Sequence, residues 1–247
     1  MFDIKIDDAR YWKSCIDSIV SLIDEGSFSI TKDGIGLKAM DPSSISMVSF
    51  FMPNKAFSKF EVDKTTAVGL NLENLGNILA SSRQGEQLVM KDSGNKLVLE
   101  FIGKSSKRRY KLPMIDVKKE PDKEPKIEFE SIVELKSDTL KEVLKDASLL
   151  SSHVGFKTEK ESFYVIAKGD AGEMEQEHGS NADVVKKMTI TKPSNVTFNL
   201  DYLERMIRAC PAATAMTVSL KSEDPVKVEY KIGDAVVSYF LAPYMES

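Results

Sequence analysis

Leu70-Asn71-Leu72-Glu73-Asn74-Leu75 occurs twice, in related form, in this chain of 247 residues. It returns as Phe198-Asn199-Leu200-Asp201-Tyr202-Leu203, and each residue lies 128 positions after its counterpart, as Asn199 does after Asn71. The same offset aligns four further pairs: Trp12 with Leu140, Ile16 with Leu144, Leu22 with Leu150 and Phe28 with Phe156. A period this long exceeds the roughly 20–50 residues of solenoid repeats. It matches the size of one ordinary domain, so the sequence predicts a duplicated domain.

Composition supports two domains with separate cores, because 42% of the residues are hydrophobic. Charged residues make up 29% of the chain with both signs mixed, and the formal net charge is -4. This balance argues against coating nucleic acid by bulk charge, but it allows a local basic surface. Cys15 and Cys210 lie in apolar stretches and are expected to be reduced core thiols, with a disulfide as the lesser alternative. We find no signal peptide and no membrane-spanning run, which predicts an intracellular protein.

Hydrophobic periodicity predicts short helices and many strands in the first half. Asp8 is placed to cap a helix over residues 9–23, whose apolar stripe is formed by Trp12, Ile16 and Ile19. A second helix is expected over residues 72–82. Strands are expected over residues 2–6, 27–31, 34–40, 46–52, 60–62, 67–71, 87–91, 97–102 and 108–112.

The second half repeats this order after a charged segment. Residues 118–126 contain two prolines and no apolar residue, so they are predicted to form an exposed linker. Asp138 is expected to cap a helix that ends at Leu150, and another helix is expected over residues 200–209. The expected strands cover residues 132–135, 154–158, 163–168, 196–199, 216–220, 226–232 and 236–241, with a polar stretch after residue 168.

These elements predict an α+β protein with two pseudo-repeated domains, over residues 1–117 and 127–247, joined by the linker. Each domain is expected to be an antiparallel sheet that carries two helices on one face.

Four motifs in this order are similar to those of sliding clamps of the proliferating cell nuclear antigen family, of the archaeal type. They are Met40-Asp41-Pro42-Ser43, Asn71-Leu72, Lys111-Leu112-Pro113-Met114-Ile115-Asp116 and Phe240-Leu241-Ala242-Pro243. The resemblance spans essentially the whole chain. It implies a homotrimeric ring of six like domains around duplex DNA, with the helices lining the hole and the sheets forming the outer wall.

In functional terms, the resemblance implies a processivity factor for DNA replication and repair, without catalytic activity, metal or cofactor. Such a clamp tethers DNA polymerase, flap endonuclease and ligase through short peptide motifs, and an ATP-driven clamp loader opens it. The protein is then expected in the cytoplasm, associated with the nucleoid.

Basic residues lie on the helix faces opposite the apolar stripes. Taken alone, they are ordinary solvated charges. The resemblance implies instead that they face duplex DNA and contact phosphates without reading sequence. The set consists of Arg10, Lys13, Lys141, Lys145, Arg205 and Arg208, with Arg83 just past the second helix. At four positions where clamps often carry a base, this chain has Val20, Asn77, Ala80 and Asp201.

Two strands of opposite charge are candidates for the contact between subunits. Lys107, Arg108 and Arg109 precede Tyr110 on one strand, and Glu173, Glu175 and Glu177 alternate on another. In the family, the matching strands are sheet edges that pair between neighbours. A positive and a negative edge on one chain favour head-to-tail assembly and oppose pairing of like edges. The alternatives are solvated strand faces or, for the basic run, a targeting patch.

The family's client peptides dock beside the linker, a loop near residue 45 and the C-terminal tail. The matching residues are Met40, Ser44, Ile45, Met47, Pro225, Phe240, Ala242, Pro243 and Met245. Methionine and large apolar side chains make an adaptable pocket, although Met40 and Met47 are equally suited to the core. The linker lacks the apolar residues common in relatives, so Val117, Ile127 or Phe129 are expected to replace that wall.

Two other interpretations remain open. The chain could be one subunit of a heterotrimeric clamp. It could also be a metal-dependent enzyme, since Asp170, Glu173, Glu175, Glu177 and His178 are close in sequence. The sequence offers no phosphate-binding glycine loop or activated nucleophile to support catalysis. His153, the second of the two histidines, is expected at a helix end.

Overall fold

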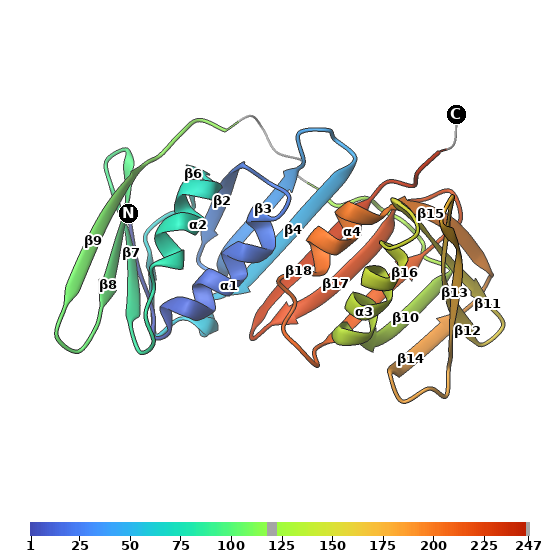
Figure 1. The fold of residues 1–247 in the computed structure, drawn as a ribbon. Helices are drawn as coiled ribbons and strands as arrows, with labels where there is room; N and C mark the ends of the chain where they lie inside the picture. Colours follow the sequence, from blue (N-terminus) through green and yellow to red (C-terminus); the bar gives the residue numbers. More distant parts are fainter. Residues whose placement is uncertain (118–122, 246–247) are drawn as a thin grey trace. The chain divides into compact units, whose positions relative to one another are not determined.

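The computed structural model describes residues 1–117 and 123–245, which form two compact units (Figure 1). Unit 1 contains Met1–Ser43, Val48–Glu124 and Ile232–Val237, and unit 2 contains Ser44–Met47, Pro125–Lys231 and Ser238–Ser247. Residues 118–122 of the predicted linker lie outside the described residues. The boundaries expected for the two repeats, 1–117 and 127–247, therefore stay a prediction.

Unit 1 is built from antiparallel strands and two helices. One sheet has the strand order β5-β1-β7-β8-β9, and β4, β3, β2 and β6 follow one another in a second sheet. The elements are β1 (Phe2–Ile6), α1 (Ala9–Val20), β2 (Glu25–Thr31), β3 (Gly34–Met40), β4 (Ser46–Pro53), η1 (Asn54–Ala56), β5 (Lys59–Val62), β6 (Thr66–Asn71), α2 (Leu72–Ala80), β7 (Gln87–Ser93), β8 (Lys96–Ile102) and β9 (Lys107–Pro113).

Unit 2 repeats this plan. Its strands follow the order β14-β10-β16-β17-β18 in one sheet and β13-β12-β11-β15 in another. The elements are β10 (Ser131–Lys136), α3 (Ser137–Ala147), β11 (His153–Glu159), β12 (Ser162–Gly169), β13 (Gly172–Gly179), β14 (Val185–Ile190), β15 (Ser194–Asn199), α4 (Leu200–Ile207), β16 (Ala215–Leu220), β17 (Val226–Ile232) and β18 (Ala235–Leu241).

The backbone contacts repeat with the offset of 128 residues that the sequence predicts. Phe28 faces Val68 across β2 and β6, and Phe156 faces Val196 across β11 and β15. The amide of Ala9 donates to the carbonyl of Glu86 at 2.9 Å, and its counterpart Ser137 donates to Thr214 at 2.9 Å. The α+β class and the duplication are therefore confirmed, with two sheets in each unit where the sequence suggested one.

The second helix of each unit begins at an asparagine cap. Asn71 accepts a hydrogen bond from the amide of Asn74 at 2.8 Å, and Asn199 accepts one from the amide of Tyr202 at 3.3 Å. Both caps have extended backbone, so each asparagine ends a strand and satisfies a free amide of the first helical turn. The repeated stretch thus encodes a strand-to-helix junction.

In each unit, a segment from later in the chain hydrogen-bonds to the outer edge of the strand that precedes the asparagine cap. The amide of Ile115 donates to the carbonyl of Gly69 on β6 at 2.9 Å. In unit 2, the amide of Tyr244 donates to Thr197 on β15 at 2.8 Å. A Cβ at Gly69 would lie 2.1 Å from the carbonyl oxygen of Ile115, so only glycine permits this approach.

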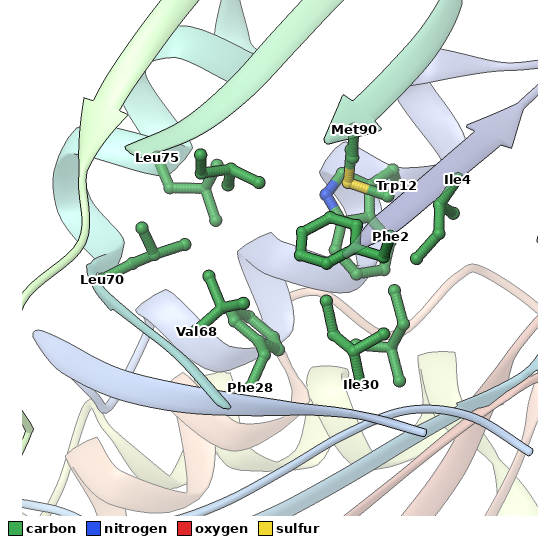
Figure 2. Close-up of a pocket in the computed structure, with 11 residues that line it drawn as sticks. Phe2, Ile4, Trp12, Phe28, Ile30, Val68, Leu70, Leu75 and Met90 are labelled. Atoms are coloured by element: carbon green, nitrogen blue, oxygen red, sulfur yellow. The ribbon is translucent and has the colours of Figure 1, made fainter. Parts of the chain in front are cut away.

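An aromatic cluster around Trp12 forms the centre of the unit 1 core. The indole is 3% exposed and its ring lies 6.2–6.3 Å from the rings of Phe28, Phe50 and Phe57. Beside it is an apolar cavity of about 20 Å³, bounded by Phe2 and Met90 among others (Figure 2). A space of this size holds about one water at most, and its apolar lining favours a dry void. This interior is a packed core without room for a substrate.

Two buried tyrosines of unit 2 are joined by a hydrogen bond. The hydroxyl of Tyr230 donates to the carbonyl of Met206 at 2.9 Å and lies 3.0 Å from the hydroxyl of Tyr239.

The two cysteines are free and buried, as expected. Burial raises the pKa of Cys15 to about 12 and that of Cys210 to about 11, so both thiols stay protonated at neutral pH. Within the described residues, no helix is long and apolar enough to cross a membrane.

Several expectations for the second half were wrong in detail. Helix α3 ends at Ala147 and its N-cap is Lys136, so Asp138 lies inside the first turn and accepts from the amide of Ala213 at 2.8 Å. The polar stretch after residue 168 forms two strands, β13 and β14. Both have one face in solvent and therefore few apolar residues, so their hydrophobic pattern was too weak to predict them. His153 begins strand β11 and caps no helix.

Replacing either cap with alanine is expected to lower the free energy of unfolding by about 0.5–2 kcal/mol, because one helix-terminal amide loses its acceptor. Asn71→Ala should cost at least as much as Asn199→Ala, since its hydrogen bond is the shorter. Urea titration followed by circular dichroism measures this. Asn77→Ala, at an exposed position within α2, is the control and should be neutral. Equal stability of all three variants would contradict the role of the caps.

Candidate functional site

Three basic residues predicted to face DNA come together between α3 and α4. Lys141, Lys145 and Arg208 line an open hollow of about 320 Å³, together with Glu204 and Ile207. The ammonium of Lys141 donates to the carbonyl of Cys210 at 2.6 Å and of Arg208 at 3.4 Å. It thereby satisfies carbonyls at the end of α4, which a cation there stabilises.

Three other predicted DNA-facing residues, Arg205, Arg10 and Lys13, are paired with nearby carboxylates. Arg205 lies 3.4 Å from Asp201, and Arg10 lies 3.7 Å from Asp8, the N-cap of α1. Lys13 forms an i,i+4 ion pair with Asp17. Pairing of this kind in solvent contributes little stability but reduces the positive potential of the surface. Arg83 is exposed beyond α2, where its amide donates to Glu86 at 2.8 Å.

The two strands predicted to lie at subunit contacts are both edge strands. β9 is the last strand of the five-stranded sheet in unit 1, and β13 is the last strand of its sheet in unit 2. Each therefore has one side that is not covered by another strand of its own sheet. Edge strands of this kind are templates for pairing with another chain.

Hairpin geometry identifies which backbone groups face outward on these edges. In an antiparallel pair, positions bonded to the neighbouring strand alternate with positions that point away from it. The bonds Met114 to Asn95 (2.8 Å) and Gly103 to Ser106 (2.9 Å) fix this alternation for β9, and the bond Ser180 to Glu161 (2.8 Å) fixes it for β13. The outward positions are Lys107, Arg109, Lys111 and Pro113 on β9, and Glu173, Glu175, Glu177 and Gly179 on β13.

The basic side chains of β9 are already paired within unit 1. Lys107 lies 2.8 Å and Arg109 lies 2.6 Å from Glu100. Arg108 turns inward, where it contacts Glu86 at 2.6 Å and covers the ring of Phe101 at 4.9 Å. Neither carboxylate was predicted from the sequence, although Glu100 stands directly opposite Arg109 in the register. The attraction of this edge for an acidic strand is consequently weaker than the three basic residues alone suggest.

Alternation on β13 separates its acidic side chains from His178. Glu173 pairs with Lys168 at 3.2 Å, and Glu177 accepts from Ser162 at 2.6 Å and Tyr164 at 3.0 Å, all on the exposed face. His178 is 6% exposed on the opposite face and stacks against Phe163. Burial lowers the pKa of this imidazole, which favours the neutral form.

This separation removes the basis of the metal-enzyme interpretation. No group of three His, Cys, Asp or Glu side chains in the described part of the chain is placed to hold a metal ion. The acidic residues of β13 thus belong to a strand face and an edge.

The candidate peptide-binding residues of unit 2 meet where the C-terminal tail crosses a loop. The amide of Ala242 donates to the carbonyl of Ile45 at 2.9 Å. Ile45 and Met245 are 40% and 79% exposed, whereas Phe240 and Met47 are nearly buried at 4% and 3%. The latter two are therefore core residues that support the surface. Ser44 before Ile45 has a φ of 59°, which turns the loop sharply and presents Ile45 outward.

The tail is held by a contact that was not predicted from the sequence. The ring of Tyr244 lies 3.8 Å from the ring of His153 at the start of β11. The backbone bond from Tyr244 to Thr197 fixes the same residue. Pro243 between these anchors is half-buried, and so is Pro225 after β16. In unit 1, Met40 is exposed, and a methyl group of Val117 lies 3.0 Å from the place where a Cβ on Gly69 would be.

Comparisons with known proteins cover nearly the entire chain. Residues 1–122 match the profile of the proliferating cell nuclear antigen N-terminal domain, and residues 123–245 match that of its C-terminal domain. A DNA polymerase sliding clamp of Methanococcus vannielii is 33% identical over 245 residues, covering 97% of this chain and 98% of the relative. Another from Thermofilum pendens is 29% identical over 241 residues, covering 97% of each.

Solved structures agree with this assignment. The crystal structure of PCNA from Thermococcus kodakaraensis superposes with a TM-score of 0.93 at 25% identity, covering 99% of this chain and 100% of that one. PCNA of A. fulgidus superposes with a TM-score of 0.91 at 24% identity over the full length of both chains, which supports the fold.

Glu100 should make the protein sensitive to acid. The hydrogen bond from Lys107 and the pairing with Arg109 hold its pKa below the ordinary 4.5, although burial alone would raise it. A carboxylate with a lowered folded-state pKa stabilises the fold above its unfolded pKa, and this stability disappears as the pH falls through the folded value. We expect Glu100→Gln to be less stable than the wild type at pH 7 and to lose less stability between pH 5 and pH 3. Urea unfolding across this pH range measures both, and parallel pH profiles would contradict the assignment.

Proposed function

The chain belongs to the proliferating cell nuclear antigen family, and from this premise we propose how its residues carry out the family's task. It is a DNA polymerase sliding clamp, a processivity factor that acts with duplex DNA and replication proteins. The family is not enzymatic, so its work consists of encircling and tethering. The observation that carries this conclusion is the duplicated architecture, in which both halves match the family over their full length.

Three copies of the chain close head to tail into a ring of six domains. The outward backbone groups of β9 pair with those of β13 in the next copy, which extends a sheet across each contact. A heterologous contact gives a closed ring if its rotation closes, and one chain supplies both edges. Since Lys107, Arg108 and Arg109 are paired with Glu86 and Glu100, backbone pairing rather than charge provides most of the closure.

Client proteins bind at the surface where the tail crosses the loop of Ile45. Exposed Ile45, Tyr244 and Met245 offer apolar contact, and the buried Met47 and Phe240 support them from below. The related A. fulgidus PCNA was solved with the C-terminal region of FEN-1 bound. We assign the same kind of partner here: short peptide motifs of polymerase, flap endonuclease, ligase and clamp loader. The tail then has to remain ordered, which the Tyr244–His153 contact favours.

Duplex DNA passes along the helices, which offer few and exchangeable phosphate contacts. Such contacts carry no sequence information, so the ring is free to slide. The protein works in the cytoplasm, on the nucleoid, where replication and repair take place.

The mass of the protein in solution tests self-assembly. Light scattering over a dilution series should give about 82.5 kDa, three times the 27.5 kDa of one chain. The trimer should then lengthen the products of a family B polymerase on primed circular DNA in the presence of a clamp loader. A mass of 27.5 kDa at all concentrations would contradict the homotrimer and would favour a clamp that needs other subunits.

Two substitutions at one position separate backbone pairing from charge in ring closure. Glu175→Pro removes an outward amide of β13 while leaving the bonds to β12, so we expect monomers at micromolar concentration. Glu175→Gln keeps the amide and removes the charge, so we expect a trimer with little change. Light scattering and circular dichroism of both variants provide the readout. Trimers in the proline variant, or monomers in the glutamine variant, would contradict closure through the backbone.

A further inference from the structure

The two units differ in how a later segment is held against the edge strand before the asparagine cap. In unit 1, this segment packs closely on β6, because a Cβ at Gly69 would lie 2.1 Å from the carbonyl oxygen of Ile115. The residue 128 positions after Gly69 is Thr197 on β15, which carries a Cβ and a branched side chain. An equally close approach is therefore sterically closed to the C-terminal tail of unit 2.

The tail also lacks the backbone donor that unit 1 uses. The amide of Ile115 bonds to Gly69, but the residue 128 positions later is Pro243, which has no amide hydrogen. The bond to β15 is made one residue further on, from the amide of Tyr244 to the carbonyl of Thr197 at 2.8 Å. Tyr244 is consequently the residue that joins the tail to β15.

His153 makes a second contact with Tyr244. The centroids of the two rings lie 3.8 Å apart, and the ring planes meet at 36°. The imidazole is itself fixed, because His153 begins β11 and its Nδ1 lies 3.0 Å from the hydroxyl of Ser152. In unit 1, the corresponding residues are Glu25 and Asp116, which have no rings to bring together. The ring contact thus belongs to unit 2 and is not a repeated feature of the fold.

The position of Tyr244 determines the shape of the client surface. Two residues earlier, the amide of Ala242 donates to the carbonyl of Ile45 at 2.9 Å, so the tail is bonded on both sides of Pro243. Ile45, Tyr244 and Met245 are the exposed residues of this surface. Release of Tyr244 would free the tail beyond Ala242, because Pro243 has no amide hydrogen with which to bond elsewhere. The apolar side chains of the tail would then lose their fixed place.

We propose that His153 is a positioning residue for client binding: its ring holds Tyr244 and thereby keeps the tail in the conformation that a client peptide meets. This rests on the client site proposed above. His153 acts through Tyr244 and not by touching the peptide. An ordered surface binds more tightly than one that must first become ordered, because the measured dissociation constant rises as the competent fraction falls. A contact between two such rings changes an equilibrium of this kind by about two- to tenfold.

A double-mutant cycle between the two rings tests this role. The full-length, assembled protein is titrated against a fluorescent peptide with the sequence of the C-terminal region of the same organism's flap endonuclease, and anisotropy gives the dissociation constant. We expect His153→Ala to raise this constant about two- to tenfold, and His153→Phe, which keeps a ring against Tyr244, to stay within about twofold of the wild type. In a Tyr244→Ala background, His153→Ala should have no further effect, because both residues act through one contact.

Lys157→Ala is the matched control. Lys157 lies on the same strand and the same face as His153, so its replacement should leave peptide binding unchanged. Hydrogen exchange followed by mass spectrometry reports on the tail without any peptide. His153→Ala should speed the exchange of the Tyr244 amide and leave the amides of β17 unchanged. Circular dichroism and light scattering confirm that each variant is folded and assembled like the wild type.

Three outcomes would contradict the proposal. Unchanged peptide binding by His153→Ala would overturn the role of His153 and leave the client site intact. Equal weakening by His153→Ala with and without Tyr244 would do the same, because the effect would not pass through the tail. Failure of the wild type to bind the peptide would overturn the client site and, with it, the role of His153 in client binding.

Discussion

The strand-to-helix junction at Asn71 and Asn199 is the constraint on which both units depend. At each junction, the asparagine ends an edge strand, and the next amide is fixed by a carbonyl just beyond the first helix of the unit. Leu72 donates to Asp24 at 2.8 Å, and Leu200 donates to Ser152 at 3.0 Å. These bonds orient the second helix beside the first in each unit. The outward faces of the helices, and the surfaces they form, follow from this orientation.

The sequence was sufficient for the class and most elements, because these depend on local patterns, and for the duplication, because several segments recur at one offset of 128 residues. Turn residues, alternation and the repeated Asn71 motif are all short-range signals. Side-chain partners depended on the register between distant strands, which the patterns did not provide. Arg108 illustrates this: its neighbours suggested an exposed basic run, but Glu86 and Phe101 draw it into the unit.

The candidate surfaces were predicted with uneven success for the same reason. Exposed Ile45 and Met245 were identified by resemblance, but so were Met47 and Phe240, which are buried. The contact between Tyr244 and His153 was not predicted, since nothing near either residue in the sequence indicates it. Lys141 was expected to face DNA, yet it is also bound to the carbonyls that end α4. Sequence patterns locate a charged residue on a helix face, but they do not show which groups its side chain already binds.

Pro113 at the end of β9 limits the backbone pairing that we propose between neighbouring chains. It lacks an amide hydrogen, so the outward donors of β9 are those of Lys107, Arg109 and Lys111, whereas β13 has four outward positions, at Glu173, Glu175, Glu177 and Gly179. In the proposed ring, the row of donors on β9 therefore ends at Lys111, and Pro113 marks where the sheet shared by two chains stops.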